Sequence, residues 1–299
     1  YVCFFNNIYN LLMPELPEVE IIKKSLTKVA NNTKIISIKI NNKNLRYKIS
    51  KTFRSELLNK KIMRISRRSK YIIFYFRNKL LIMHLGMTGK LLVIRKKDNQ
   101  VFKTSFYYNL DIIHKHNHLY FTLSNGFILI YNDVRRFGFF KLYKGSNLNS
   151  INFLKNLGPE PLTNNFNIMY FQQFIKNKKK NVKSMLMDQK FVSGLGNIYV
   201  NEALYMAKIH PLRVSSGINK KEANKIIYHI KFILKFAILK GGSTIRDFKN
   251  SSGKSGKFQQ FFRVYGKEGE DCSRISCKKK IKKIFISARS TFYCNNCQK

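Results

Sequence analysis

The sequence predicts an α+β protein of two domains, with an N-terminal β-sandwich and flanking helix followed by a C-terminal helical domain that ends in a small hairpin. Three observations support this class. Short strand-like runs separated by turn residues fill the first half of the chain, and helical patterns replace them from Asn152. Four cysteines gather in the last 28 residues, where they could hold together a hairpin too small to have its own core.

The flanking helix and the strands come first along the chain. A helix is predicted over Val19 to Val29, where apolar residues recur at helical spacing and give one stripe. Short apolar runs then predict strands, with turn pairs such as Asn125-Gly126 between them. The runs are Ile35 to Ile40, Ile62 to Ser66, Tyr71 to Phe76, Leu80 to His84, Leu91 to Ile94, Leu119 to Ser124, Phe127 to Tyr131 and Phe139 to Tyr143.

The second half of the chain is predicted to be mainly helical. Gly158-Pro159-Glu160-Pro161 marks a hinge between the halves, and Asn219 to Leu239 is the longest helix candidate. From Phe258 the pattern returns to strands. A chain of 299 residues is long enough for two domains with cores of their own. We therefore expect a leader at residues 1–12, the β-sandwich domain at 13–150, the helical domain at 151–257 and the cysteine hairpin at 258–299.

The chain carries a strong excess of positive charge. It has 57 Lys and Arg residues against 15 Asp and Glu residues, a net charge of +42. A protein this basic binds polyanions, and nucleic acid is the expected partner. An AT-rich genome would raise the number of lysines as well, and a run such as Lys178-Lys179-Lys180 can be solvated surface. No uninterrupted apolar run of about 18 residues is present, so we expect no membrane span.

The cysteine spacing predicts a zinc site. Cys272 and Cys277 form one pair, Cys294 and Cys297 form another, and 16 residues separate the pairs. This is the spacing of a tetrahedral four-cysteine site, and four protein ligands leave no position for a reacting water, so we expect one structural Zn²⁺. Four unrelated buried cysteines are the alternative, which the grouping in pairs disfavours. Metal binding also points to a reducing compartment.

Residues 13–20 read MPELPEVE and place a proline directly after a methionine. If translation starts at Met13 and the methionine is removed, Pro14 becomes an amino-terminal secondary amine. An α-amine has a pKa of about 7.7–8.0, so roughly a tenth of it is neutral and nucleophilic at pH 7. Attack of such an amine on a sugar carbon is Schiff-base chemistry. The structural alternative is that the two prolines and the three glutamates of this string only mark the start of a helix.

Residues 1–12 precede this string and decide whether that chemistry is possible. They are too short, and too interrupted by asparagines, to span a bilayer, and they lack the basic start of a secretory signal. We expect them to be absent from the mature protein. If they were retained, the nitrogen of Pro14 would be an amide and could not form an imine.

The MPELPEVE string resembles the amino terminus of the formamidopyrimidine-DNA glycosylase family, and the similarity runs from Met13 to Lys299. The resemblance implies a base excision repair enzyme that removes oxidised purines from duplex DNA and then cuts the strand. It also implies a helix–two-turn–helix in the helical domain and a zinc-finger hairpin at the end of the chain. Four residues take catalytic roles by this resemblance, with Pro14 as the nucleophile, Glu15 as the acid, and Lys70 and Arg289 on the flanking phosphates.

Further motifs match loops of the family. Leu81 to Gly89 resembles a loop that sends a side chain toward DNA, and Asp133 to Gly138 resembles a second insertion loop, with Val134 in place of the usual proline. Each matching residue also has a plainer reading, such as a core side chain, a surface Arg–Phe stack, a helix N-cap or a flexible connector over 251–257. The DNA contacts implied by the resemblance are His84, Met87, His116, Arg135, Phe137, Lys178, Asn197 and Lys254.

Two other functions remain open from the sequence. The related endonuclease VIII group prefers oxidised pyrimidines, and Leu16 together with the set Met87, Arg135 and Phe137 favours the purine enzyme by resemblance. A zinc-ribbon protein that binds nucleic acid without catalysis would explain the charge and the cysteines but leaves Pro14 without a purpose. We expect a monomer that acts on double-stranded DNA in the bacterial cytoplasm.

Overall fold

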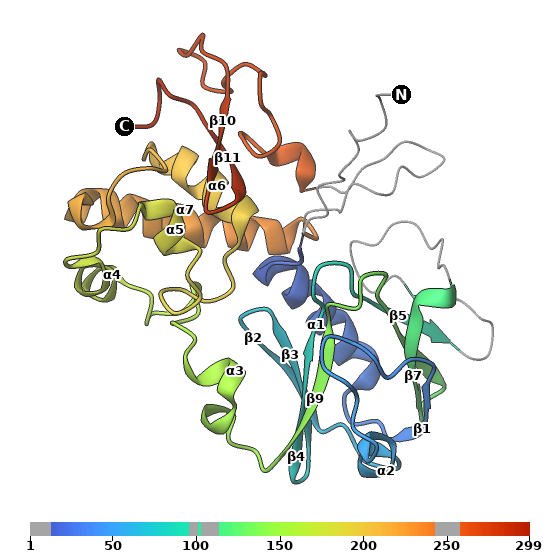
Figure 1. The fold of residues 1–299 in the computed structure, drawn as a ribbon. Helices are drawn as coiled ribbons and strands as arrows, with labels where there is room; N and C mark the ends of the chain where they lie inside the picture. The colour runs from blue at the N-terminus through green and yellow to red at the C-terminus, as the bar shows by residue number, and fades with distance from the viewer. Residues whose placement is uncertain (1–12, 96–100, 103–113, 243–257) are drawn as a thin grey trace, which may run out of the picture.

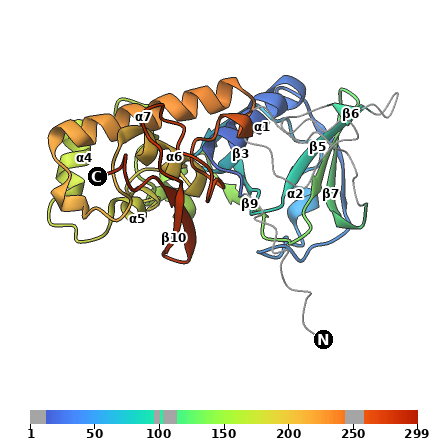
Figure 2. The same cartoon turned by 90° about the horizontal axis from the view of Figure 1, so that it is seen from above.

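The computed structural model describes residues 13–95, 101–102, 114–242 and 258–299 of the chain. Figure 1 shows two lobes, one built of strands and one of helices, and Figure 2 shows the same lobes from above with helix α1 between them. The predicted leader at residues 1–12 and the loop over 251–257 lie outside the described residues. The predicted domain boundaries stay predictions.

The first lobe is a sandwich of two antiparallel sheets. Its inner faces meet in one apolar core, to which Phe74 and Leu81 contribute from one sheet and Leu129 from the other. The sheets have the strand orders β1-β7-β8-β5-β6 and β2-β3-β4-β9. The strands are β1 Ile35–Ile40, β2 Arg64–Arg68, β3 Tyr71–Phe76, β4 Lys79–His84, β5 Lys90–Arg95, β6 Val101–Phe102, β7 Asn117–Leu123, β8 Phe127–Asn132 and β9 Phe139–Lys144.

The eight predicted strands therefore all form, and the predicted sandwich is confirmed. Two of them are shifted along the chain. Strand β7 spans Asn117–Leu123, where Leu119 to Ser124 is predicted. The sequence predicts a strand from Ile62, whereas β2 begins at Arg64. Ile62 instead pairs with the backbone just before β1, because its amide donates to the carbonyl of Thr33 and its carbonyl accepts the amide of Asn32. The short helix α2 (Phe53–Leu57) joins β1 to β2.

Helix α1 (Leu16–Ala30) connects the two lobes. Its apolar stripe buries Val19, Ile22 and Leu26, as the spacing predicts, and the helix packs against both β2 and the long helix α7 (Lys220–Leu239). The residues that precede α1 are thereby placed at the junction of the lobes. Among the described residues, no helix combines the length and the apolar character that crossing a bilayer requires.

The second lobe is helical. Its helices are α3 (Asn152–Lys155), α4 (Ile168–Ile175), α5 (Val182–Leu186), α6 (Asn197–Ala207) and α7. The start of α7 is fixed by a capping box, in which Asn219 accepts a hydrogen bond from the amide of Glu222 and the Glu222 carboxylate accepts one from the amide of Asn219. The longest predicted helix is therefore confirmed to within one residue.

The tail differs from its prediction. The sequence predicts strands from Phe258, but the chain forms a 3-10 turn at Gln259–Phe261 and then loops until β10 (Lys282–Ile286) and β11 (Arg289–Tyr293). The amides of residues 263–265 bond to the buried carboxylate of Glu202 instead of to a neighbouring strand. Because Glu202 lies on α6, these bonds fasten the tail to the helical lobe.

The predicted hinge is held by ion pairs. Glu160 forms ion pairs with Arg67 and Arg68, which end strand β2, at 2.8 and 3.1 Å. Arg67 also bonds Glu20 of α1 at 2.8 Å, and Arg68 donates to the carbonyl of Gly158 at 2.7 Å. Burial alone would raise the pKa of Glu160, but the two arginines reverse this and lower it. This network joins the sandwich, α1 and the helical lobe at one point.

Candidate functional site

A polar cavity of about 450 Å³ lies where the two lobes meet. Most of the predicted catalytic side chains line it. Pro14 is buried between two lining residues, Met13 and Glu15. The predicted site residues on its wall are Glu15, Lys70, His84, Met87, Asn197 and Arg289.

Glu15 sits at the base of the cavity and caps α1. One carboxylate oxygen, Oε1, accepts a hydrogen bond from the amide of Ile198 at the start of α6, at 3.0 Å. The other, Oε2, is buried and has no hydrogen-bond partner within the described part of the chain. Burial raises the pKa of Glu15 to about 7, although Lys70 nearby opposes the rise. A carboxyl with this pKa is partly protonated at neutral pH and can donate a proton.

Glu18 supports Glu15 from the next turn of α1. Its carboxylate accepts hydrogen bonds from the amide of Glu15 at 3.0 Å and from the hydroxyl of Tyr199 at 2.7 Å. Leu16 adds a third link between α1 and α6, because its amide donates to the carbonyl of Gly194. Bonds made by Glu15, Leu16 and Glu18 therefore fix the amino-terminal string against the start of α6 and the loop before it.

Lys70 and His84 come from neighbouring strands of the sandwich. Lys70 lies in the β2–β3 turn, after Ser69 in the left-handed region, and burial lowers its pKa. His84 ends β4, where its Nδ1 accepts a hydrogen bond from the amide of Gly86 at 3.0 Å. Burial and the nearby Lys70 lower the pKa of His84 to about 4. At neutral pH this histidine is uncharged, and its Nε2–H is left as a donor for an anion.

Arg289 reaches the cavity from the tip of the tail hairpin. The two turn residues, Ser287 and Ala288, have φ of 50° and 56°, the left-handed pair that a tight hairpin turn requires. Asn197 donates its side-chain amide to the carbonyl of Ser290 at 2.9 Å. The N-cap reading of Asn197 is wrong, because Gly196 is the N-cap and Asn197 is the first residue of α6. Its side chain instead ties the helix to the hairpin.

Sequence reasoning missed one lysine at this site. Lys183 of α5 is fully buried, and its ammonium donates to the hydroxyl of Thr291 at 2.6 Å and to the carbonyl of Ser290 at 3.2 Å. Burial and the nearby Arg289 lower the pKa of Lys183 to about 7. Nothing in the local sequence signals this, since Lys183 follows a run of lysines that reads as surface.

The two predicted insertion loops meet at the rim of the cavity. The guanidinium of Arg135 lies 4.5 Å from the ring centroid of Phe137 and donates to the sulfur of Met87 at 3.3 Å. Phe137 keeps 41% of its surface exposed. The surface Arg–Phe stack that the sequence left as an alternative is therefore present, and Met87 extends it toward the cavity.

Two further predicted DNA contacts, His116 and Lys178, do not line the cavity. His116 ends a 3-10 turn at His114–His116, and its carbonyl accepts the amide of Asp133. Lys178 is exposed and lies 5.5 Å above the ring of Phe174. Lys254 is outside the described residues. The roles of these three residues stay predictions.

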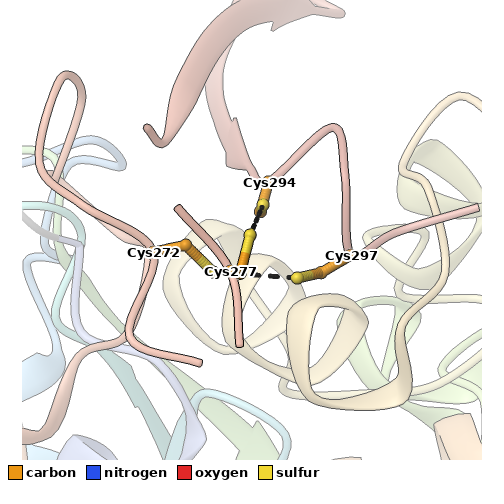
Figure 3. A group of neighbouring side chains, drawn as sticks. All are labelled: Cys272, Cys277, Cys294 and Cys297. Atoms are coloured by element: carbon orange, nitrogen blue, oxygen red, sulfur yellow. Dashed lines mark hydrogen bonds between the residues drawn. The ribbon is translucent and has the colours of Figure 1, made fainter. Parts of the chain in front are cut away.

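The four predicted zinc ligands form one cluster in the tail (Figure 3). Their sulfur atoms all lie within 4.8 Å of one another. The Cys272–Cys297 and Cys277–Cys294 sulfur pairs are 3.8 and 3.6 Å apart. A zinc–sulfur tetrahedron with bonds of about 2.3 Å has edges of about 3.8 Å. The donor set and its spacing therefore fit one zinc ion, and the alternative of four unrelated cysteines is wrong.

Comparison with protein families shows which family the chain belongs to. Residues 13–140 match the formamidopyrimidine-DNA glycosylase N-terminal domain, and residues 157–249 match the formamidopyrimidine-DNA glycosylase H2TH domain. The chain belongs to the formamidopyrimidine-DNA glycosylase family. The formamidopyrimidine-DNA glycosylase of Zymomonas mobilis is 41% identical over 291 residues, covering 96% of this chain and all of that protein. That of Wolbachia pipientis is 42% identical over 290 residues, with the same coverage.

Solved structures of proteins with this family name are similar to the chain in fold and sequence. A Lactococcus lactis Fpg variant in complex with Fapy-dG-containing DNA has a TM-score of 0.82 and 36% identity, over 95% of this chain and 99% of that one. The Lactococcus lactis Fpg in complex with abasic-site DNA has a TM-score of 0.81 at the same identity and coverage. The predictions of the fold and of a base excision repair glycosylase are confirmed at the level of the family.

Proposed function

We propose that the protein removes oxidised purines from duplex DNA and then cuts the abasic strand through an imine on Pro14. One observation carries this proposal. The buried Glu15, with its pKa raised to about 7, lies directly beside Pro14 in a cavity that also holds Lys70 and Arg289. A nucleophilic nitrogen, a proton donor and cations for phosphates are then present together, which is what base excision by an amine requires.

The chemistry begins at the sugar. The nitrogen of Pro14 attacks C1′, the bond from C1′ to the base breaks, and Glu15 gives a proton that assists ring opening and departure of the base. The resulting iminium acidifies the neighbouring sugar proton. Successive β- and δ-elimination then break the two carbon–oxygen bonds to the flanking phosphates. Pro14 must be the amino terminus for this to occur, and the match to the family's N-terminal domain begins at residue 13.

The DNA is held on both sides of the lesion. Lys70, Arg289 and Asn197 would bind the flanking phosphates, and the neutral His84 would donate its Nε2–H to another phosphate oxygen. The damaged base leaves the stack, and Met87, Arg135 and Phe137 fill the gap. His116, Lys178 and Lys254 would add contacts along the backbone.

Zinc would be held by Cys272, Cys277, Cys294 and Cys297, and it would stabilise the tail without taking part in the reaction. Its effect reaches the active site through the hairpin, because β11 begins at Arg289 and leads into Cys294. We further propose that the protein acts as a monomer on double-stranded DNA in the cytoplasm, where the chromosome of a bacterium is found.

Borohydride trapping tests the proposal. A form that begins at Pro14 and a form that retains the preceding residues should be incubated with an 8-oxoguanine duplex and reduced. The first form should give a covalent adduct, with the modification located on Pro14 by mass spectrometry, and the second should give none. Absence of an adduct from the first form would falsify the lyase assignment. Competition with a thymine-glycol duplex separates the purine enzyme from an endonuclease VIII-like preference, and nicking of an abasic duplex separates both from a non-catalytic zinc ribbon.

A further inference from the structure

The two insertion loops are joined by a buried acid that has no part in the chemistry above. Asp133 is the first residue of the second loop and is fully buried. Its carboxylate accepts hydrogen bonds from the hydroxyl of Tyr131 at 2.8 Å, from the amide of Gly138 at 2.9 Å and from the hydroxyl of Thr88. Thr88 directly follows Met87 in the first loop, so one carboxylate binds both loops.

Thr88 of the first loop also binds the backbone of the second loop directly. Its hydroxyl oxygen accepts the amide of Arg135 at 3.1 Å, and the same amide lies 3.3 Å from the carboxylate of Asp133. The backbone that carries the Arg135 side chain is therefore anchored to the first loop as well as to the acid. Met87 and Arg135 are also in direct contact through sulfur and guanidinium.

Three glycines allow this close approach. A Cβ added at Gly86 would lie 2.5 Å from the backbone of residues 137 and 138, and one added at Gly138 would lie 2.6 Å from the carbonyl oxygen of His84. A Cβ added at Gly89 would lie 2.7 Å from the hydroxyl of Tyr131. The loops therefore pack backbone to backbone around the Asp133–Tyr131 pair.

We propose that Asp133 is a positioning residue that makes Met87, Arg135 and Phe137 a single preformed wedge for the gap left by the flipped base. This inference rests on the proposed function. Two separate loops would each have to be ordered when DNA binds, which costs binding free energy for every side chain immobilised. Hydrogen bonds to a buried carboxylate are strong and directional, so the two loops enter the duplex already aligned.

The role predicts a substrate-dependent defect. Asp133→Asn keeps the shape of the side chain but replaces one oxygen by an NH₂ group. An NH₂ group cannot accept the hydrogen bonds that this oxygen accepts, so the buried donors facing it lose their partner. The kcat/KM for excision of 8-oxoguanine opposite cytosine should fall about 10- to 100-fold. This is the fold-change that corresponds to the usual cost of leaving a buried hydrogen-bonding group unpaired. Excision of the same lesion opposite a one-nucleotide gap should lose less than about threefold, because no wedge is needed there.

Two further variants keep the test decisive if Asp133→Asn does not fold. Thr88→Val removes the hydroxyl that joins the loops while keeping its shape, and Thr122→Val is the matched control on β7, away from both loops. A 2-aminopurine placed opposite a non-cleavable abasic analogue reports wedge insertion by its fluorescence. The rise seen for wild type and Thr122→Val should shrink in Thr88→Val and Asp133→Asn.

The outcomes separate this inference from the proposed function. Equal losses on the paired and the gapped substrates, or a full fluorescence rise in both loop variants, would reduce Asp133 to a structural residue and overturn the inference. The fluorescence measurement requires no catalysis. A wild-type protein that inserts the wedge but forms no borohydride adduct would therefore contradict the proposed lyase and leave the wedge intact.

Discussion

Replacing Glu15 with glutamine tests the proposed acid, because glutamine keeps the shape of the side chain but has no proton to give. Burial raises the pKa of Glu15 from 4.5 to about 7. At pH 7 about half of these carboxyls are protonated, whereas about one in three hundred would be at the ordinary value. The buried position therefore increases the supply of the acid form by about 150-fold.

The loss should depend on the substrate. Glu15→Gln should remove 8-oxoguanine about 10² to 10⁴ times more slowly, the usual contribution of a general acid. Cutting of a duplex that already contains an abasic site should fall far less, because no base has to leave. Single-turnover rates on the two duplexes measure the ratio. Folding should be retained, because the glutamine oxygen can still accept from the amide of Ile198, and a melting curve checks this.

The pH profile gives an independent reading of the same group. The acid form of Glu15 disappears as pH rises through about 7, while the neutral amine of Pro14 accumulates up to about pH 8. Above about pH 8 the rate of base removal by the wild type should therefore fall roughly tenfold per pH unit. This alkaline limb should be missing in Glu15→Gln. A limb that persists, or equal losses on both duplexes, would refute the assignment of Glu15 as the acid.

Two further predictions concern the parts that support the site. Cys294→Ser should release zinc, measured by elemental analysis, and should expose the tail to trypsin. Asn295→Ser, at an exposed position between the same two cysteines, is the control and should change neither. Stoichiometric zinc in Cys294→Ser would contradict the cluster. Gly196→Ala would place a Cβ 2.3 Å from the Glu15 carboxyl carbon, so this carboxyl would have to shift and give up its hydrogen bond from the amide of Ile198. Base removal should therefore fall, and the melting temperature should drop by several degrees. Gly217→Ala, with open space around its Cβ, is the matched control, and equal behaviour of the two alanine variants would count against this packing.

The sequence predicts the elements well because their signals are local. The strands of the sandwich alternate with turn residues, and α7 begins with a capping box that can be read from Asn219 and Glu222 alone. The cysteine pairs are equally local, since a knuckle needs only its own spacing. The tail before β10 is the main failure, and its cause is distant. Its amides are taken by Glu202, which lies 61 residues before the first of them.

The site is predictable only where a motif carries it. Lys183 looks like part of a surface lysine run, and its burial depends on Thr291, which is 108 residues away. Arg67 and Glu160 likewise find each other only after the two lobes meet. Patterns in a single sequence do not predict such pairings, because hydrophobic periodicity and residue spacing describe one segment at a time. The hydrogen bond from Thr88 to Asp133, 45 residues apart, cannot be predicted for the same reason.

The buried acids explain how so basic a chain can keep its cations for DNA. Only 15 acids face 57 cations in the chain, and within the described part of it four acids are buried. Glu15 and Glu202 accept from backbone amides, Glu18 from an amide and a tyrosine hydroxyl, and Asp133 from an amide and two hydroxyls. Backbone amides fix a carboxylate without using a lysine or arginine. The acids can therefore anchor α1, the wedge loops and the tail, while Arg289 at the cavity and Arg135 at its rim remain available for DNA.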